Sequence, residues 1–245
     1  MRALILASGR GSRLGELTAK QPKCFTPVAQ KRLVEWQKLA LSGAGINQLA
    51  VTTGYFSDSF KPLFEKRFHN PLWASSNMVY SMLQAKNYIA EESCIISYSD
   101  IVYSADAVKR LQSCHDDIAI AYDPKWLSQW QARYENPLDD AESFSMQQGY
   151  LTDIGRKVNN LDEINGQYMG LLKFTVNGWQ QVLNYLNQLS HEQLAKLDMT
   201  SLLQGLIKAG HSIAAVAIAD EWFEVDTLED LLVAEQQVAN FSWNQ

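Results

Sequence analysis

Residues 3–24 read ALILASGRGSRLGELTAKQPKC, an apolar run that opens into a loop of glycine, serine and basic residues. A buried strand that leads into such a loop presents a row of backbone N–H donors beside fixed positive charge. Polyphosphates bind to that combination of groups. The stretch therefore predicts a site for a nucleoside triphosphate. The alternative is a solvated, flexible loop, although functional residues concentrate in loops of this kind.

Two common glycine motifs compete for the same residues, and counting weakens both. A dinucleotide fingerprint needs G-x-G-x-x-G, but the sixth position counted from Gly9 is Leu14, and Gly15 comes one place too late. A P-loop needs a Gly-Lys pair, which the chain lacks. What remains is a basic glycine loop that ends in Pro22-Lys23, where proline stiffens the backbone beside the lysine that we expect to reach the phosphates.

Charge is unevenly distributed along the chain. Residues 1–35 carry seven basic and two acidic side chains, a net charge of +5, whereas the remaining 210 residues carry −11. A local positive patch on an acidic protein suits a small anionic ligand, because the rest of the surface repels a long polyanion. We therefore expect no binding to nucleic acid.

Length and composition indicate one large α/β domain over residues 1–245, since 47% of the residues are hydrophobic and no linker or repeat interrupts the chain. The first apolar run is too short for a signal peptide and no run of eighteen apolar residues follows, so we expect a cytoplasmic protein without membrane contact. The three cysteines, Cys24, Cys94 and Cys114, form no C-x-x-C pair, and we expect them to be reduced. Nothing in the sequence argues for or against a homo-oligomer.

Short β-type runs alternate with helical patterns. The runs cover residues 3–7, 48–53, 94–98, 117–122, 168–174 and 212–219, and helical patterns follow Arg32, Asn77 and Ser104. This alternation predicts a mostly parallel sheet covered on both faces, with ligands at the carboxyl ends of its strands. Residues 122–150 break the rhythm, and we expect them to form an excursion or small lobe over the site.

Two further strand ends carry carboxylates. Asp100 follows the apolar run of residues 95–99, and Asp226 precedes a helix for which Thr227 and Asp230 have capping-box spacing. Each aspartate alone is explained as a turn residue or a cap. If both aspartates lie at the same sheet edge as a triphosphate loop, the pair predicts a Mg²⁺ site. Mg²⁺ binds through one or two carboxylates plus substrate phosphates. A D-x-D glycosyltransferase loses ground, since Asp100 is followed by Ile101-Val102.

With these blocks, the chain resembles the sugar-nucleotide type of nucleotidyltransferases, whose signature is G-x-G-x-R followed by P-K, here Gly9, Gly11, Arg13, Pro22 and Lys23. The resemblance implies a three-layer α/β/α Rossmann-like nucleotidyltransferase fold with a mostly parallel central sheet. It also implies roles for individual residues. Arg13 and Lys23 are the expected catalytic residues, and Asp100 and Asp226 the expected metal ligands. The expected nucleotide-binding residues are Leu6, Ala7, Gly9, Gly11, Ser12, Arg13, Lys23, Asn77 and Asp100.

Within that superfamily, the chain is similar to the phosphocholine cytidylyltransferase branch. The similarity lies in the blocks at residues 76–81, 97–100, 166–171 and 224–226. It implies that CMP passes from CTP to a small phosphorylated alcohol, an amine-bearing phosphate or a phosphonate. Relatives of the branch also act on an amino-acid-derived phosphate in pathways of cell-surface polysaccharide biosynthesis.

The acceptor is encoded more weakly than the nucleotide. Tyr80, Glu142, Tyr168 and Glu224 are candidates for contact with it. The aromatic residues Trp126, Trp130, Tyr134 and Tyr168 suit a cage for a quaternary ammonium by cation-π contact, and they suit packing of the core or of a lid equally well. Glu142, Asp139 and Asp140 suit an ammonium group, or a solvated turn.

Two other functions stay open at this stage. A hexose 1-phosphate nucleotidyltransferase that uses UTP, dTTP or GTP would have the same loop, but it would need polar residues that read a sugar where the chain has aromatic ones. A non-catalytic nucleotide-binding regulator would tolerate loss of Lys23 or of a metal carboxylate, and the chain keeps all of them. Retention of these groups favours an enzyme.

Overall fold

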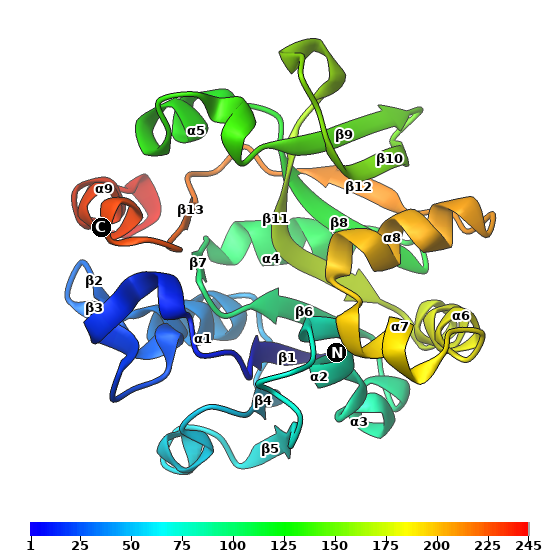
Figure 1. Ribbon diagram of the computed structural model, residues 1–245, viewed down its shortest axis with the longest axis horizontal. Helices are drawn as coiled ribbons and strands as arrows, with labels where there is room; N and C mark the ends of the chain where they lie inside the picture. The colour runs from blue at the N-terminus through cyan, green and yellow to red at the C-terminus, as the bar shows by residue number, and fades with distance from the viewer. Residues whose placement is uncertain (245) are drawn as a thin grey trace.

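The computed structural model describes residues 1–244. In the described part of the chain, the helices are α1 Leu33–Gly43, α2 Met78–Leu83, α3 Lys86–Ala90, α4 Ala105–Ser113, α5 Leu127–Arg133, α6 Val176–Leu186, α7 His191–Lys196, α8 Met199–Lys208 and α9 Leu228–Ala239. The strands are β1 Arg2–Ala7, β2 Pro27–Val28, β3 Lys31–Arg32, β4 Leu49–Thr53, β5 Lys66–His69, β6 Cys94–Tyr98, β7 Ile101–Val102, β8 Ile118–Asp123, β9 Glu142–Gln147, β10 Tyr150–Lys157, β11 Gln167–Phe174, β12 Ala214–Ala217 and β13 Phe223–Glu224. Figure 1 shows how these elements are arranged.

A nine-stranded sheet runs through the described residues in the order β5-β4-β1-β6-β11-β8-β12-β10-β9. Its strand pairs are parallel except where β11 and β10 meet their neighbours, so the sheet is mixed and these two strands run against the other seven. All six predicted strands are present as β1, β4, β6, β8, β11 and β12, with ends that differ by one or two residues.

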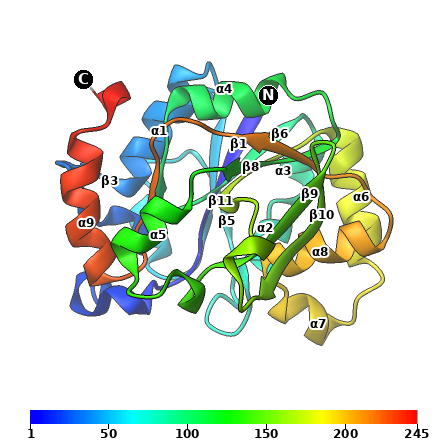
Figure 2. The same cartoon turned by 90° about the horizontal axis from the view of Figure 1, so that it is seen from above.

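Helices cover both faces of this sheet. On one face α1 packs against α4, and α4 contacts β8 and β11. On the other face α2 lies against β1 and β4, α6 against β11 and α8 against β10. Figure 2 shows α1 and α4 on one side of the sheet and α2 and α8 on the other. The predicted three-layer α/β/α fold is confirmed.

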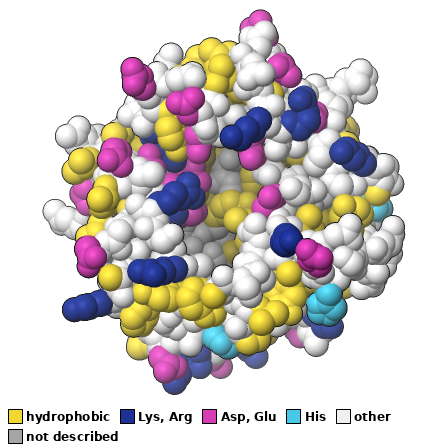
Figure 3. Space-filling view, viewed as in Figure 1, with side chains coloured by type: hydrophobic (Ala, Val, Ile, Leu, Met, Phe, Trp, Pro, Cys, Tyr) yellow, Lys and Arg dark blue, Asp and Glu magenta, His cyan; other side chains and the backbone are white. Residues whose placement is uncertain are grey.

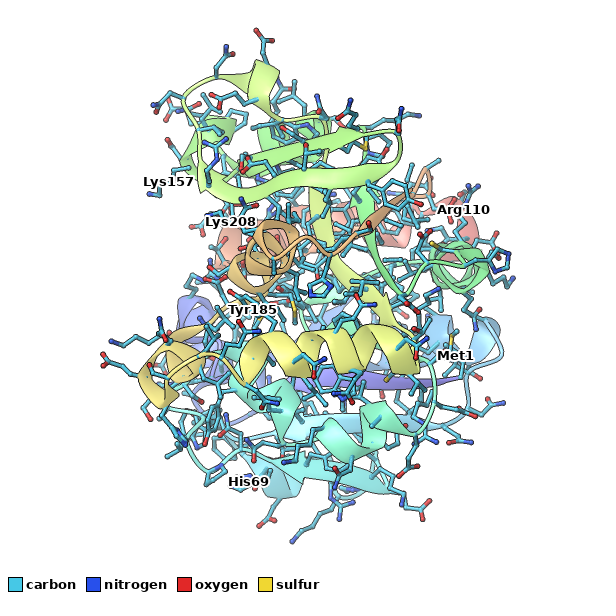
Figure 4. All side chains as sticks on the ribbon, turned by 90° about the vertical axis from the view of Figure 1, so that its right-hand side faces the viewer. Met1, His69, Arg110, Lys157, Tyr185 and Lys208 are labelled. Atoms are coloured by element: carbon cyan, nitrogen blue, oxygen red, sulfur yellow. The ribbon has the colours of Figure 1, made fainter. Side chains whose placement is uncertain are left out.

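The central strands are buried on both sides, because apolar residues occupy both faces of β1 and β8. Helix packing outside the sheet is also close. Tyr185 of α6 extends toward α8, where a side-chain carbon added to Gly205 would lie 2.0 Å from the Tyr185 hydroxyl (Figure 4). Within residues 1–244, no helix combines the length and the hydrophobicity that crossing a bilayer would need.

Residues 122–150 contain the end of β8, the helix α5, and β9. The helix α5 packs against α9, whereas β9 pairs with β10 and continues the main sheet at its edge. This segment therefore joins two different parts of the molecule. The end of α5 contacts Glu224 of β13, and at the start of β9 the Glu142 carbonyl accepts a hydrogen bond from Gln167 of β11. The predicted single domain extended to residue 245, which lies outside the described residues.

Candidate active site

The glycine loop after β1 is anchored at several points. The Leu14 side chain is fully buried, and the Thr18 hydroxyl donates to the carbonyl oxygens of Gly11 and Gly15 at 3.0 and 3.2 Å. The Tyr55 backbone N–H donates to the Ser8 carbonyl at 3.0 Å. Buried contacts and hydrogen bonds at both ends hold a loop in one conformation. The loop therefore has a defined conformation and is not a flexible connection.

Gly11 is a position in this loop where only glycine fits. Its backbone is left-handed, with φ 67° and ψ 46°, and a side-chain carbon added there would lie 2.6 Å from Cβ of Lys23. Residues with a side chain avoid this backbone region, and no such carbon approaches another so closely. Gly11 thus lets the Lys23 side chain pass directly behind the loop.

Lys23 begins a short turn of 3₁₀-helix, Lys23–Phe25, after Pro22. Its ammonium donates to Asp100 Oδ2 at 2.7 Å and forms a second ion pair with Asp226 Oδ1. Arg13 reaches the other oxygen of Asp226, with NH2 3.0 Å from Oδ2. The expected catalytic residues and the expected metal ligands therefore lie in one cluster of charges.

Topology explains why these residues meet. The strands β1 and β6 are parallel neighbours, with Leu6 opposite Tyr98, so the loop after β1 and Asp100 after β6 leave the sheet at the same edge. The short strand β13 then pairs with β7, with Glu224 opposite Ile101. The Val225 N–H donates to the Asp100 carbonyl at 2.9 Å. This pairing places Asp226 beside Asp100.

Glu224 is the third carboxylate at this place. Asp100, Glu224 and Asp226 each offer an oxygen, and these oxygens lie within 4.8 Å of one another. Oδ1 of Asp100 is buried and has no hydrogen-bond partner within residues 1–244. Carboxylate oxygens that converge in this way, one of them unsatisfied, fit a hard dication such as Mg²⁺. The residues present therefore suit the expected metal.

The charges in the cluster shift one another's titration. Burial lowers the pKa of Lys23, but Asp100 and Asp226 outweigh burial and raise it above its ordinary value. Burial acts against ionisation of Asp226 too, yet Lys23 and Arg13 hold its pKa below the ordinary value. Burial, followed by repulsion from Asp226, raises the pKa of Glu224 to about 8. A bound dication would favour the ionised form of all three carboxylates.

A cavity of about 210 Å³ opens between this cluster and the start of α2. Figure 3 shows a hollow near the centre of the same face as Figure 1, with acidic and basic side chains together at its edge. Six predicted site residues line the cavity: Leu6, Gly9, Gly11, Lys23, Asn77 and Asp100. The other lining residues were not predicted for the site, although four of them lie in the blocks at residues 76–81 and 97–100: Ser8, Trp73, Ser76, Met78, Ser81 and Ser99.

The remaining predicted nucleotide-binding residues, Ala7, Ser12 and Arg13, lie within two positions in the chain of a residue that lines this cavity. Ala7 is buried at the end of β1, where its N–H donates to the Thr52 hydroxyl at 3.2 Å. Ser12 is exposed and begins the 3₁₀ segment Ser12–Thr18, in which Arg13 lies. Asn77 caps α2, and its Oδ1 accepts from the Met78 N–H at 2.7 Å.

The acceptor candidates separate in the structure. Glu224 joins the carboxylate cluster, and Tyr80 lines a different cavity, between α2 and α6. Glu142 begins β9, where burial and then the charge of Asp198 raise its pKa. The Tyr168 ring meets the Tyr98 ring edge to face, with centroids 5.7 Å apart. Tyr168 therefore lies beside the strand that leads to Asp100.

Some of the aromatic residues that were candidates for binding an ammonium group contact the side chain of Arg133 instead. Trp126 and Trp130 are buried and pack edge to face. The guanidinium carbon of Arg133 lies 5.1 Å from the ring centroids of both Trp130 and Tyr134. Two of the four aromatic residues thus lie against a cation of the chain itself, and Trp126 packs on one of them.

Sequence reasoning missed Arg133 as a member of the site. Its NH1 donates to Glu224 Oε2 at 3.0 Å and its Nε to Asp230 Oδ1 at 2.7 Å. These partners are 91 and 97 residues away along the chain, so no local pattern joins them. The sequence marked Asp230 only as part of a helix capping box with Thr227, and not as a residue of the site. The structure confirms that capping box at the start of α9.

Comparison with known proteins gives a match over most of the chain. The model of the MobA-like NTP transferase domain matches residues 3–149. A CTP:phosphoglutamine cytidylyltransferase of Campylobacter jejuni is 38% identical over 249 residues, which cover 95% of this chain and 98% of that protein. A choline-phosphate cytidylyltransferase of Streptococcus pneumoniae is 36% identical over 99 residues, which cover 39% of this chain and 43% of that protein.

Solved structures with the same fold include two CTP-dependent enzymes. The inositol-1-phosphate CTP transferase of T. maritima superposes with a TM-score of 0.79 at 18% identity, and the match covers 97% of this chain and 95% of that one. The CTP:phosphocholine cytidylyltransferase of Streptococcus pneumoniae gives a TM-score of 0.73 at 20% identity, with 97% and 98% covered. At these identities the likeness establishes the fold.

Proposed function

Because the chain belongs to the family of MobA-like NTP transferase domains, we propose that it transfers CMP from CTP to a small phosphorylated acceptor and releases pyrophosphate. The family expected from the glycine loop is confirmed, and with it the prediction of a nucleotidyltransferase. One observation carries the proposal for the chemistry. Lys23, Asp100 and Asp226 meet at the mouth of a cavity that the glycine loop lines.

CTP is the proposed donor because a relative that is 38% identical over 95% of this chain is named for CTP. The proposed acceptor carries an amine or amide nitrogen besides its phosphate. The same relative is named for phosphoglutamine, and another, of Streptomyces rubellomurinus, for CMP-5'-(3-aminopropyl)phosphonate. The second relative is 25% identical and the match covers 92% of this chain but 37% of that protein. Glu142 is the side chain that we propose for contact with the nitrogen. Its backbone carbonyl accepts a hydrogen bond from Gln167, which precedes Tyr168 in β11.

The proposed reaction is an in-line displacement at the α-phosphorus. An oxygen of the acceptor phosphate forms the new P–O bond, and the bond to the β-phosphate breaks, with its electron pair leaving on pyrophosphate. A phosphate monoester has a second pKa near about 6, so the attacking oxygen is already ionised at neutral pH and needs no general base. This agrees with a site built from cations and carboxylates.

The residues of the chain then have to position the phosphates and balance their charge. Lys23 and Arg13 stand next to the cavity and can turn from Asp226 to the α-phosphate and to the leaving pyrophosphate. Preorganised cations at the point where negative charge develops are a large part of the catalysis of phosphoryl transfer. The backbone N–H groups of the loop around Gly9 and Gly11 supply further donors for the phosphate oxygens.

Asp100, Glu224 and Asp226 would hold Mg²⁺ on the grounds of their convergence and of the unsatisfied Oδ1 of Asp100. Bound there, the ion would neutralise phosphate charge as a Lewis acid. A role in cell-surface polysaccharide biosynthesis, a cytoplasmic location and the small lobe over the site stay predictions.

A pyrophosphate-release assay tests the proposal. It pairs CTP, UTP, GTP and dTTP in turn with phosphocholine, aminoethylphosphonate, phosphorylated glutamine and glucose 1-phosphate. We expect turnover with CTP and a nitrogen-bearing acceptor. A preference for UTP, GTP or dTTP with glucose 1-phosphate would replace the proposal by a hexose 1-phosphate nucleotidyltransferase. Nucleotide binding without turnover on any acceptor would favour a regulator.

A further inference from the structure

Tyr98 is the last residue of β6 and lies two positions before Asp100. In the pairing of β6 with β1, it stands opposite Leu6. Paired residues of neighbouring strands project from the same face of a sheet, so Tyr98 shares the face on which Leu6 lines the nucleotide cavity. The residue is half-buried. Tyr98 therefore lies beside the nucleotide cavity, on the side toward β11.

The backbone of Tyr98 is held from the other face of the sheet. The Ser97 hydroxyl donates to the Tyr98 carbonyl oxygen at 2.8 Å, and the Tyr103 hydroxyl donates to the Ser97 hydroxyl at 3.0 Å. On β11, Gly170 leaves room for the Tyr98 ring, since a side-chain carbon added there would lie 2.7 Å from Cδ2 of Tyr98. The Tyr98 ring therefore occupies a space that a larger residue at position 170 would fill.

Tyr168 of β11 packs beside Tyr98 and carries a hydroxyl group without a partner. The two rings meet edge to face, with centroids 5.7 Å apart. Oη of Tyr168 is buried and has no hydrogen-bond partner within residues 1–244. Burial raises the pKa of Tyr168, and the Tyr98 hydroxyl opposes this shift, so the two hydroxyl groups lie near each other. A buried hydroxyl group without a partner is costly, and it marks a place where a ligand completes the hydrogen bonding.

The charges around this tyrosine pair limit which ligand group suits it. Asp100 follows Tyr98 closely in the chain and converges with Glu224, and Glu142 is tied to Gln167, the residue before Tyr168. A carboxylate of the acceptor would be repelled by these acidic groups. A quaternary ammonium has no N–H to donate and no lone pair to accept a hydrogen bond. An amide offers an uncharged carbonyl oxygen that accepts from a tyrosine hydroxyl.

We propose that Tyr98 and Tyr168 form a subsite for an amide group of the acceptor. The Tyr98 hydroxyl donates to the amide carbonyl oxygen, and the Tyr168 hydroxyl donates to Oη of Tyr98 and so positions it. This inference rests on the proposed function, because it specifies the acceptor of the same site. It also gives the unpartnered hydroxyl of Tyr168 a partner in the bound state.

The same hydrogen bonds would make the site selective. Successive hydrogen bonds polarise one another, so the bond from Tyr98 to the ligand gains from the bond that Tyr98 accepts. An acceptor without an amide leaves both hydroxyl groups without this chain of bonds. Sites built to hydrogen-bond a substrate group discriminate against analogues that lack it. Tyr98 and Tyr168 therefore select for an amide, whereas the proposed role of Glu142 concerns the nitrogen.

The test removes each hydroxyl group and keeps each ring. Pyrophosphate release is measured with CTP and either phosphorylated glutamine, which carries an amide, or aminoethylphosphonate, which does not. We expect Tyr98→Phe to raise the KM for phosphorylated glutamine about tenfold, as loss of one hydrogen bond predicts. The KM values for aminoethylphosphonate and CTP should not change. The control is Tyr150→Phe, which removes an exposed hydroxyl that donates to Asp116 at 3.1 Å, and we expect no change in any KM.

A double-mutant cycle tests the positioning role of Tyr168. Tyr168→Phe should raise the KM for phosphorylated glutamine at least threefold in the otherwise unaltered chain and leave it unchanged in the Tyr98→Phe background, because the effect passes through the Tyr98 hydroxyl. A merely structural role would instead raise the KM for both acceptors and lower the unfolding temperature. All measurements are made well below the unfolding temperature of each variant.

Three results would overturn the inference: an unchanged KM for phosphorylated glutamine in Tyr98→Phe, equal rises for both acceptors, or an equal effect of Tyr168→Phe with and without the Tyr98 hydroxyl. Failure of the proposed function looks different, since the unaltered chain then releases no pyrophosphate from CTP with any acceptor. Calorimetric titration with phosphorylated glutamine decides the inference in that case. Binding about tenfold weaker to Tyr98→Phe would support it, and equal binding or no binding to the unaltered chain would overturn it.

Discussion

The ammonium of Lys23 bridges Asp100 and Asp226, which lie 77 and 203 residues further along the chain. A lysine in this position neutralises two carboxylates that face a cavity, and so keeps the site ordered before a metal or a nucleotide arrives. Lys23 is the residue that we expect to contact the phosphates, and Asp100 and Asp226 are the residues that we expect to hold the metal. The ion pairs therefore join the expected phosphate site to the expected metal site.

Lys23→Ala is expected to lower turnover at least 100-fold while some nucleotide binding remains, because one preorganised cation is lost where charge develops. Steady-state pyrophosphate release gives the turnover, and calorimetric titration with CTP gives the binding. Lys61→Ala is the matched control, since Lys61 is exposed and pairs with Asp58 on the surface. Near-normal turnover of Lys23→Ala would remove Lys23 from the mechanism.

Metal removal is expected to abolish pyrophosphate release, and added Mg²⁺ to restore it. Asp226→Asn keeps the shape of the side chain but removes its charge, so it should lower turnover at least 100-fold and raise the Mg²⁺ concentration needed for half-maximal rate. Asp58→Asn, at an exposed position, serves as control. Full activity in the presence of excess chelator would exclude a metal role for the three carboxylates.

Gly11→Ala is expected to inactivate the protein beyond what backbone strain explains. A left-handed backbone costs a residue with a side chain about 1–2 kcal/mol, and at Gly11 the added carbon also meets Lys23. Gly149→Ala isolates the first effect, since Gly149 has φ 85° and nothing within 4 Å of the added carbon. We expect a loss of thermal stability in both variants, larger for Gly11→Ala, and a loss of turnover for Gly11→Ala alone. Equal turnover in the two variants would contradict the close passage of Lys23.

Glu142→Gln tests the acceptor side of the proposal. If Glu142 contacts an ammonium group, the KM for a nitrogen-bearing acceptor should rise about tenfold, as expected for one charge-assisted hydrogen bond. The KM for CTP should stay the same, because the nucleotide cavity does not include Glu142. Asp139→Asn provides the comparison at the neighbouring turn. An unchanged acceptor KM would show that Glu142 does not contact the acceptor.

The central sheet and half of the site were predictable because their signals are local. An apolar run followed by Gly9, Gly11 and Arg13 marks a strand and an anion-binding loop within a dozen residues, and apolar runs ending in Asp100 or near Asp226 mark strand ends. Parallel neighbours bring such ends to one edge. The meeting of Lys23 with Asp100 follows from these rules, since β1 and β6 are parallel neighbours.

The second half of the site depends on contacts that no local pattern encodes. The short strand β13 pairs with β7 through only two residues on each side, and this pairing makes Glu224 a neighbour of Asp100. Arg133 enters from α5, about ninety residues away from its partners. From the sequence, Trp130 and Tyr134 were candidates for contact with the ammonium group of a ligand. Residue type alone does not show which cation such rings contact, and in the structure the cation is Arg133.

The most direct test of the central claim follows the fate of two labels in CTP. The account predicts that ³²P at the α-position passes into a CMP-acceptor product, whereas ³²P at the γ-position leaves as pyrophosphate. Chromatography of the mixture after incubation with Mg²⁺ and a phosphorylated, nitrogen-bearing acceptor separates the two products. Transfer of the γ-label to the acceptor would contradict attack at the α-phosphorus, and so would γ-label released as inorganic phosphate with CDP as the other product.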